Sequence, residues 1–325
     1  MQLLTGLNPY GLTYHLGLQA RGTRRANPRP AGLEGFIALG RELDARTLEL
    51  WDGWLLSLGD AALGALKQRL SGATLVVSAG LEHAQIEPLL HIAAVLDAPL
   101  IRLAGTPILC GDRAIADPPW PQRVRLVRDK LAPFAEAASR AGRTLVIENH
   151  QDFTSDELVA LCEEFGPALR IAYDTGNSFP VAEAPLDFTR AVAPYVAHLH
   201  LKDYRVQRTE EGIRLVRCAI GDGAVPFAEL VAILARHHAM LPAVLEPGAL
   251  EVRHVRLLTD AWWQFYPPRD DARLQRCLEA TGRNALPPAA DWRTPWERGK
   301  DGEVEAYELD MIRRSAANMR AIGIM

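Results

Sequence analysis

The chain has 325 residues, of which 48% are hydrophobic, so it can bury the core of one large α/β barrel or of two smaller domains. Its formal net charge is only −4, from 36 basic and 40 acidic residues, and no block of like charge indicates binding to nucleic acid or to a membrane surface. The four cysteines are far apart and include no C-x-x-C pair, which argues against a disulfide framework or a thiolate zinc site.

Short apolar runs bounded by chain-breaking residues predict eight β-strands. In chain order, these runs occupy residues 3–10, 47–51, 74–78, 99–104, 144–149, 169–174, 196–202 and 243–246. Amphipathic helical patterns fall between them at residues 33–43, 61–70, 86–96, 124–141 and 226–237, and a further helix is predicted to start near Thr154. Strands that alternate with helices indicate a parallel α/β fold.

Eight strands alternating with helices over about 250 residues predict a (β/α)8 TIM barrel. The alternative is a doubly wound open sheet, which needs a glycine-rich phosphate-binding turn after an early strand, and the segment at residues 5–9 is not one. We therefore expect the barrel to span residues 1–267. Residues 268–325 are rich in turns and end in a predicted helix at 304–322, so we expect a C-terminal extension that packs on the barrel or on a second subunit.

Four of the predicted strands end in residue types that bind metal ions. Glu148, Asp174, His200 and Glu246 each belong to an apolar, β-prone run, and the carboxyl ends of barrel strands meet at one face. Three carboxylates and one imidazole suit Mn²⁺ or Mg²⁺ better than a structural zinc ion. The pattern predicts one divalent metal ion held by these four residues.

The same segments resemble a known family. The motifs are Ile-Glu-Asn-His at 147–150, Tyr-Asp-Thr-Gly-Asn at 173–177, His-Leu-His-Leu-Lys-Asp at 198–203 and Leu-Glu-Pro-Gly at 245–248. Together they resemble the xylose-isomerase-like TIM-barrel superfamily, which includes sugar isomerases and epimerases, inosose dehydratase-like proteins and some decarboxylases. The resemblance covers most of the predicted barrel and implies the same four metal ligands.

The resemblance also implies chemical roles. In the epimerases the two glutamates, here Glu148 and Glu246, act as acid and base on opposite faces of the sugar. Asn177 stands where epimerases often have a histidine, which weakens assignment as a ketose 3-epimerase. Lys202 and Asp203 follow the ligand histidine in a His-x-Lys-Asp pattern that occurs in other branches of the superfamily.

Further polar residues in these motifs are candidates for contact with a substrate. We expect Lys202 to act in catalysis, by polarising a carbonyl group or by holding a substrate carboxylate. His150, His198, Asp203 and Asn177 are predicted to bind substrate, the histidines through its hydroxyl groups or by orienting the ligands. Other candidates for the wall of the site follow the early strands, and these are Tyr10, Tyr14, His15, Glu49 and His83.

A divalent ion can stabilise the negative charge of an enediolate, and carboxylates can remove and return an α-proton. We therefore expect a metal-dependent isomerase or epimerase that acts on a small hydroxy-carbonyl carbohydrate. The alternative is a lyase that removes CO₂ from an oxo sugar acid, because decarboxylases of the 3-oxo-isoapionate type resemble this chain in length and in the His-x-Lys-Asp pattern. A third possibility is a non-catalytic subunit built on the same barrel.

The sequence also bears on location and partners. The N-terminus has no basic segment followed by a long apolar run, and no apolar stretch of about 18 residues occurs, so a cytoplasmic protein is expected. The expected partner is a small carbohydrate, with neither nucleic acid nor membrane, and the resemblance implies a homo-oligomer.

Overall fold

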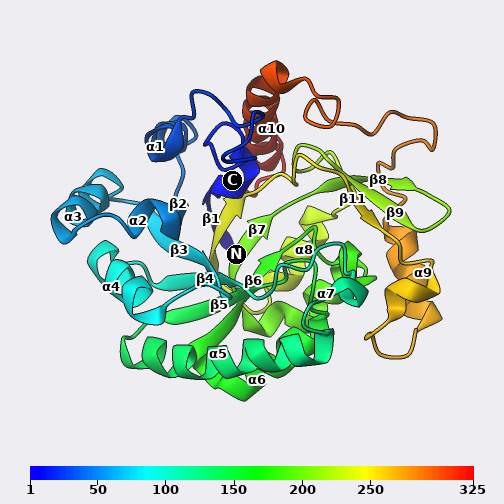
Figure 1. The fold of residues 1–325 in the computed structure, drawn as a ribbon, viewed down its shortest axis with the longest axis horizontal. Coiled ribbons are helices and arrows are strands. Elements are labelled where there is room, and N and C mark those ends of the chain that lie inside the picture. Colours follow the sequence, from blue (N-terminus) through cyan, green and yellow to red (C-terminus); the bar gives the residue numbers. More distant parts are fainter.

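The computed structural model describes residues 1–325 and contains a closed barrel of eight parallel strands surrounded by helices (Figure 1). Around the barrel the strands follow the order β1-β10-β7-β6-β5-β4-β3-β2. Their bounds are β1 (Gln2–Leu7), β2 (Thr47–Trp51), β3 (Thr74–Gly80), β4 (Leu100–Ala104), β5 (Thr144–Glu148), β6 (Leu169–Asp174), β7 (Val196–Leu201) and β10 (Met240–Leu245). The closed barrel confirms the predicted (β/α)8 fold and excludes the open-sheet alternative.

Helices connect the strands and cover the outside of the barrel (Figure 1). Their bounds are α1 (Gly32–Glu42), α2 (Asp52–Leu55), α3 (Asp60–Arg69), α4 (Ile86–Leu96), α5 (Trp120–Arg140), α6 (Ser155–Phe165), α7 (Pro185–Val192), α8 (Phe227–Leu234), α9 (Asp271–Ala280) and α10 (Asp301–Ala321). The predicted start of α6 is confirmed, since Thr154 caps this helix in a reciprocal pair with Glu157. In none of these helices is there a segment with the length and hydropathy that a bilayer crossing requires.

The strands depart from the prediction mainly at their ends. β1 stops at Leu7 rather than at residue 10, because Pro9 has no N–H to donate to a neighbouring strand. Asn8 instead caps a short 3-10 turn, η1 (Pro9–Leu12). β10 begins at Met240, before the predicted residue 243, because it pairs with β1 along the whole length of that strand.

The interior of the barrel changes from apolar to charged along its axis. A buried apolar cluster spans four neighbouring strands and comprises Val76, Leu100, Val146 and Ala172. Side chains two positions apart on a strand share a face, so Arg102, Glu148 and Asp174 come next along the interior, toward the carboxyl ends of the strands. The charged layer thus lies at the end where TIM barrels carry their functional groups.

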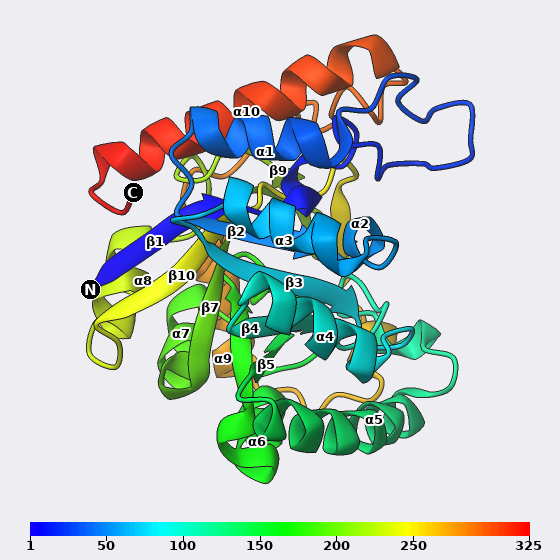
Figure 2. The ribbon, with the colours of Figure 1, turned by 90° about the vertical axis from the view of Figure 1, so that its left-hand side faces the viewer.

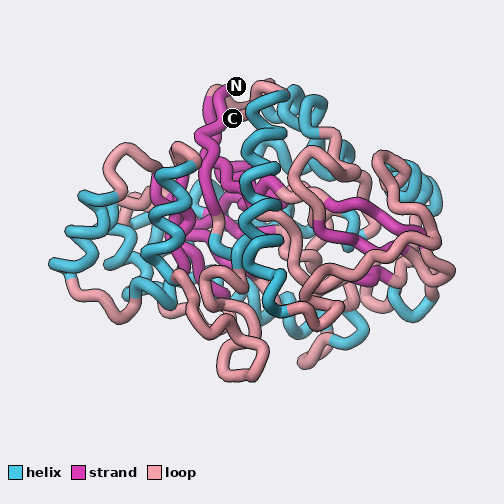
Figure 3. The backbone as a smooth tube through the Cα atoms, turned by 90° about the horizontal axis from the view of Figure 1, so that it is seen from above, coloured by secondary structure: helices cyan, strands magenta, loops and turns pink.

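A second sheet of three antiparallel strands lies beside the barrel and was not predicted (Figure 3). It consists of β8 (Tyr204–Arg208), β9 (Ile213–Arg217) and β11 (Arg253–Val255). β8 starts shortly after β7 ends, and β11 follows the loop after β10. The sheet therefore places Tyr204 and Arg253 close to the ends of two barrel strands.

The last helix, α10, packs on the barrel along the same side as α1 (Figure 2). Ile312, Ala316 and Met319 of α10 belong to the main hydrophobic core. On the surface, Arg313 Nε donates a hydrogen bond to Glu42 Oε1 of α1 at 2.7 Å. Contact between the C-terminal extension and a second subunit remains a prediction.

Candidate metal centre

The four predicted ligands lie together at the carboxyl ends of the barrel strands. Glu148 ends β5, Asp174 ends β6, His200 is on β7 and Glu246 directly follows β10. One ligand-type atom of each residue lies within 4.8 Å of the corresponding atoms of the others, and all four residues are buried. This group of four residues, the candidate metal centre, could hold a divalent metal ion.

The imidazole of His200 is oriented by Glu49 of β2. His200 Nε2 lies 2.8 Å from Glu49 Oε2, while Nδ1 lies 2.9 Å from Glu246 Oε2 and 3.5 Å from Glu148 Oε1. Because an ionised carboxylate only accepts hydrogen bonds, the Nε2–H donates to Glu49, and in the neutral ring Nδ1 presents its lone pair to the acidic cluster. A carboxylate behind a histidine commonly fixes the tautomer of a metal-binding imidazole.

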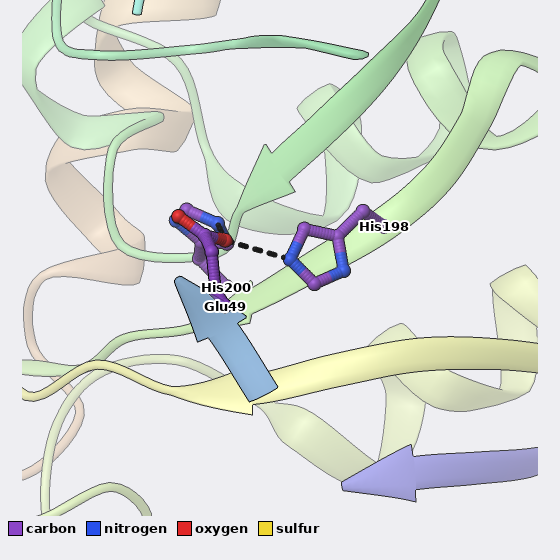
Figure 4. Close-up of side chains that lie close together, drawn as sticks. All are labelled: Glu49, His198 and His200. Carbon is purple, nitrogen blue, oxygen red and sulfur yellow. Dashed lines mark hydrogen bonds and ion pairs between the residues drawn. The ribbon is translucent and has the colours of Figure 1, made fainter. Parts of the chain in front are cut away.

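Glu49 also contacts His198, which lies deeper along β7 (Figure 4). His198 Nε2 is 2.9 Å from Glu49 Oε2, and its Nδ1 is 3.2 Å from the carbonyl oxygen of Pro242. Glu49, His198 and His200 form a second group with the chemistry of metal ligands. Since Glu49 and His198 are already paired, we interpret this group as the support that holds His200 in position.

Arg102 of β4 connects this support to the metal centre. Its Nε donates to Glu49 Oε1 at 3.1 Å, and its Nη1 lies 3.4 Å from Glu148 Oε2. Burial raises the pKa of Glu148, but the positive charge of Arg102 outweighs burial and holds the pKa of this carboxyl below its ordinary range. Glu148 is therefore ionised, as a metal ligand or a general base must be.

Buried atoms without partners test whether the cluster fits a metal ion. Glu148 Oε2, His200 Nδ1 and Glu246 Oε2 are all buried, and none makes a well-formed hydrogen bond. Their close charged neighbours are one another and Arg102, with His200 Nδ1 2.9 Å from Glu246 Oε2 and Glu148 Oε2 3.4 Å from Arg102 Nη1. Buried polar atoms normally make good hydrogen bonds, so three that do not, on residues with the chemistry of metal ligands, fit a site that a further group completes.

The balance of charge leads to the same conclusion. In this cluster four buried carboxylates, Glu49, Glu148, Asp174 and Glu246, surround two permanent cations, Arg102 and Lys202. The crowding of carboxylates is reflected in two pKa values. Burial lowers the pKa of His200, but Glu49, Glu148 and Glu246 outweigh it and raise that pKa well above its ordinary value, while burial raises the pKa of Asp174 to about 7. An excess of buried negative charge is costly unless it is neutralised. A divalent cation would balance it, and three carboxylates with one imidazole are suitable donors for such an ion.

Lys202 reaches into the metal centre. Its Nζ is 2.7 Å from Glu246 Oε1 and also bonds to Asp174 Oδ2. Burial lowers the pKa of Lys202, but these two carboxylates outweigh it and raise the pKa well above the ordinary value. The ammonium group is therefore charged and already paired with two predicted ligands, so it is not free to hold a substrate carboxylate; a catalytic role for it stays a prediction.

Two of the predicted substrate-binding residues, Asn177 and His198, contact the residues of the metal centre or their support, and for His198 this matches the second of its two predicted roles, orientation of a ligand. Asn177 Nδ2 donates to Asp174 Oδ2 at 2.8 Å, which fixes the orientation of that carboxylate. His198 is fully buried below His200 and does not reach the cavity described below. Among the four predicted substrate-binding residues, only His150 lines that cavity.

Asp203, also predicted to bind substrate, serves as a structural anchor. Its two carboxylate oxygens accept hydrogen bonds from four backbone N–H groups, those of Tyr204, Gly221, Gly223 and Val225. With both oxygens occupied and the side chain buried, Asp203 holds the turn before α8 against the start of β8. The structure thus places this residue away from the site, contrary to the prediction.

A cavity of about 290 Å³ opens onto the metal centre. Its wall includes Glu148, Lys202 and Glu246 of the centre, and Tyr10, Arg102, His150, Tyr204 and Arg253 around it. Tyr10 is thus confirmed as a wall residue. By contrast, Tyr14 and His15 are held by backbone hydrogen bonds to Glu308 of α10 and do not line the cavity, and neither does His83.

Sequence reasoning missed Arg102, Tyr204 and Arg253, and treated Glu49 only as a wall candidate. A signal for Arg102 and Glu49 was present, because each is a charged residue inside an otherwise apolar strand and a buried charge needs a partner. No comparable signal marks Tyr204 and Arg253, since their positions depend on the unpredicted sheet.

Comparison with known proteins places the chain in a family. Residues 77–254, more than half of the chain, match the model of the xylose isomerase-like TIM barrel family. The chain therefore belongs to the xylose isomerase-like TIM barrel family, as its motifs predicted.

Individual relatives are distant or match only in part. The uncharacterized protein YihM of Escherichia coli K12 is 30% identical over 107 residues, which is 33% of this chain and 33% of YihM. The chain thus matches about a third of the length of this curated relative.

Two solved structures share the fold. A xylose isomerase-like TIM barrel protein from Mycobacterium smegmatis in complex with magnesium is 18% identical, with a TM-score of 0.54 over 79% of this chain and 91% of that one. D-psicose 3-epimerase with D-tagatose from Clostridium cellulolyticum H10 is 18% identical, with a TM-score of 0.52 over 88% of this chain and 100% of that one.

Proposed function

We propose that this chain is a divalent-metal-dependent enzyme that isomerises or epimerises a small hydroxy-carbonyl carbohydrate through an enediolate. The observation that carries the proposal is the convergence of three buried carboxylates and one imidazole at a cavity, where three of these residues have a buried atom without a well-formed hydrogen bond. Mn²⁺ or Mg²⁺ is the proposed ion, and Glu148, Asp174, His200 and Glu246 would hold it.

The comparisons support this class of activity. D-psicose 3-epimerase and L-ribulose 3-epimerase have the same fold, with TM-scores of 0.52 and 0.50, and the Mycobacterium smegmatis relative was solved in complex with magnesium. These proteins are under 20% identical to the chain, so the substrate proposal rests on the site. A cytoplasmic homo-oligomer remains part of the proposal.

Different groups in the site would carry out different parts of the reaction. A bound divalent ion would supply the positive charge that stabilises an enediolate. Glu148 and Glu246 both line the cavity, so one can remove the α-proton and the other can return it. Burial raises the pKa of Glu246, but Lys202 and His200 outweigh burial and lower the pKa, which keeps this carboxylate in the basic form. Lys202 holds Asp174 and Glu246 in place.

Exchange of hydrogen with solvent tests the proposal. Manganese-loaded protein is incubated in D₂O with a panel of ketoses and oxo sugar acids, and NMR follows deuterium at the α-carbon while released CO₂ is trapped. We expect deuterium incorporation with at least one ketose or keto acid, and a loss of about 100-fold or more in Glu148→Gln. The matched control is Asp187→Asn, which removes a carboxylate from α7 that pairs only with surface arginines.

The same substrate panel distinguishes the isomerase or epimerase from the second candidate, a decarboxylase of an oxo sugar acid. An unpaired arginine in the cavity wall, Arg253, favours this candidate because it can pair with a substrate carboxylate. CO₂ release from one oxo acid would assign the lyase in place of the isomerase. Neither CO₂ nor deuterium, from protein shown to hold one equivalent of metal, would contradict both enzyme assignments and favour the non-catalytic barrel.

A further inference from the structure

The cavity wall contains three permanently charged cations that differ in their partners. Arg102 is paired with Glu49 and Glu148, and Lys202 is paired with two ligand carboxylates. The Arg253 side chain makes no hydrogen bond, its Nε is buried without a partner, and no carboxylate oxygen lies within 4.0 Å of its guanidinium nitrogens. Arg253 is therefore the one cation of the wall whose charge the protein does not neutralise.

Two more polar groups of the cavity wall lack hydrogen-bond partners. The Tyr204 hydroxyl and His150 Nδ1 are both buried without a hydrogen-bond partner, and both residues line the same cavity. Burial raises the pKa of Tyr204 to about 12, although the charges of Lys202 and Arg253 oppose it. The phenol therefore keeps its proton and can donate a hydrogen bond. Since both charges act on it, Tyr204 lies near Lys202 and near Arg253.

One acidic residue shares the wall with these groups. Glu251 lies two positions before Arg253 and lines the cavity. Its Oε1 accepts a hydrogen bond from Gln19 Nε2 at 2.5 Å, and it does not pair with Arg253. The wall at this end thus combines one free guanidinium with one carboxylate that already has a partner.

We propose that Arg253, with the Tyr204 hydroxyl, forms an anion subsite, so that the substrate of the metal centre is a sugar acid whose carboxylate pairs with this guanidinium. The inference rests on the proposed function in taking the metal centre as the place where the substrate reacts. A planar guanidinium matches a carboxylate with two parallel hydrogen bonds. The cavity, of about 290 Å³, is large enough for the acid of a small sugar.

A carboxylate fits this subsite better than a phosphate group. A phosphate carries nearly two negative charges at neutral pH and is usually met by several donors. Here a single guanidinium is free, and Glu251 is close by in the wall. One free positive charge in a wall that also contains a carboxylate can neutralise at most one negative charge, which disfavours a dianion relative to a monoanion.

The test compares three sugars that differ only at carbon 6. D-fructose carries a hydroxyl group there, D-fructuronate a carboxylate and D-fructose 6-phosphate a phosphate. Calorimetry measures the Kd of each for the manganese-loaded protein, and NMR of the same samples in D₂O records deuterium incorporation. Wild type is compared with Arg253→Gln and with Arg253→Lys, which keeps the charge without the planar fork. The matched control is Arg256→Gln, because Arg256 is an exposed arginine near the same strand that pairs with Glu211.

We expect wild type to bind D-fructuronate about tenfold or more tightly than D-fructose. Arg253→Gln should abolish this preference, Arg253→Lys should keep part of it, and Arg256→Gln should keep all of it. Because the Arg253 side chain makes no hydrogen bond or ion pair in the protein, we expect its substitution to leave the fold intact, which circular dichroism of each variant checks.

The other outcomes separate the subsite from the reaction. A preference for D-fructose 6-phosphate that Arg253→Gln abolishes would overturn the assignment to a carboxylate. Equal binding of acid and ketose, a preference that survives Arg253→Gln, or no binding of any of the three sugars would overturn the subsite. Arg253-dependent binding of the acid without deuterium incorporation or CO₂ release would support the subsite and contradict the proposed function. Deuterium incorporation that does not depend on Arg253 would support the proposed function and contradict the subsite.

Discussion

Arg102 contacts both groups of buried charged residues inside the barrel, the supporting group through Glu49 and the metal centre through Glu148. It donates to Glu49, which orients His200, and it lies 3.4 Å from Glu148 of the metal centre. Removing one partner of such a network leaves an uncompensated buried charge, which costs far more than the loss of a surface ion pair. The orientation of the predicted ligands therefore depends on residues that are not themselves predicted ligands.

Asp152, just after the metal-centre motif on β5, allows a pH-dependent prediction. Burial raises the pKa of its carboxyl to about 7, although the Thr106 hydroxyl and the Phe153 N–H donate hydrogen bonds to it. In the unfolded chain an aspartate has a pKa near 3.9. Between about pH 4 and pH 7 the folded protein thus holds a proton that the unfolded chain has released, and Asp152 makes the fold less stable as the pH rises.

Substituting Asp152→Asn should remove this pH dependence. The amide can still accept from the Phe153 N–H and can donate to the Thr106 hydroxyl, so its packing is retained. The free energy of unfolding of the variant, relative to wild type, should rise between pH 5 and pH 7 by up to about 1 kcal/mol per pH unit and then level off. Denaturant titrations at pH 5, 6, 7 and 8 measure this difference. A constant difference across the series would show that Asp152 titrates normally in the folded protein.

The sequence correctly predicted which residues converge where each of them lies at the end of its own strand. Glu148, Asp174, His200 and Glu246 converge because parallel strands bring their carboxyl ends to one face, which is a property of the fold and not of side-chain detail. Asp203 was misjudged because its partners are backbone N–H groups of a turn around residues 221–225, distant in sequence. Short motifs do not reveal contacts of this kind.

At the scale of single elements, α6 depends on its first turn. Thr154 N–H donates to Glu157 Oε2 at 2.8 Å, and the Thr154 hydroxyl accepts from the Glu157 N–H at 3.4 Å. We predict that Thr154→Val, which keeps the volume but loses the hydroxyl, lowers the free energy of unfolding by about 1 kcal/mol. Thr154→Ser, which keeps the hydroxyl, should stay within about 0.5 kcal/mol of wild type. Denaturant titration measures both values, and equal losses in the two variants would show that the cap contributes nothing.

Among the strands, those of the barrel were predictable and those of the second sheet were not. The barrel strands are apolar runs bounded by breakers, and two of them, β2 and β6, have the predicted bounds. β8 and β9 each begin with alternating apolar and polar residues and flank a short turn, a pattern that also indicates a hairpin. The prediction assigned strands only to the βα repeat, so the segment between the seventh and eighth barrel strands was left without structure.

At the scale of the whole molecule, the C-terminal extension packs along the side of the barrel and contacts the segment that follows β1 (Figure 2). Glu308 of α10 accepts hydrogen bonds from the N–H groups of Tyr14 and His15, which follow β1 and η1. Tyr14 also packs in a small buried cluster with Trp296 of the extension. These contacts join residues almost three hundred positions apart, and sequence periodicity contains no information about such pairings.

The central claim is that the barrel holds one divalent ion with Glu148, Asp174, His200 and Glu246. It is tested most directly by calorimetric titration of Mn²⁺ into metal-free protein, with Asp174→Asn as the variant and Asp187→Asn as the surface control. Asn can keep the hydrogen bond from the Gly176 N–H but lacks the ligand charge. We predict one equivalent bound by wild type and control, at least about 100-fold weaker binding by Asp174→Asn, and stabilisation of wild type by about 2.7 kcal/mol at one hundred times Kd. Absence of binding to wild type, or equal binding to Asp174→Asn, would contradict the assignment of this metal centre.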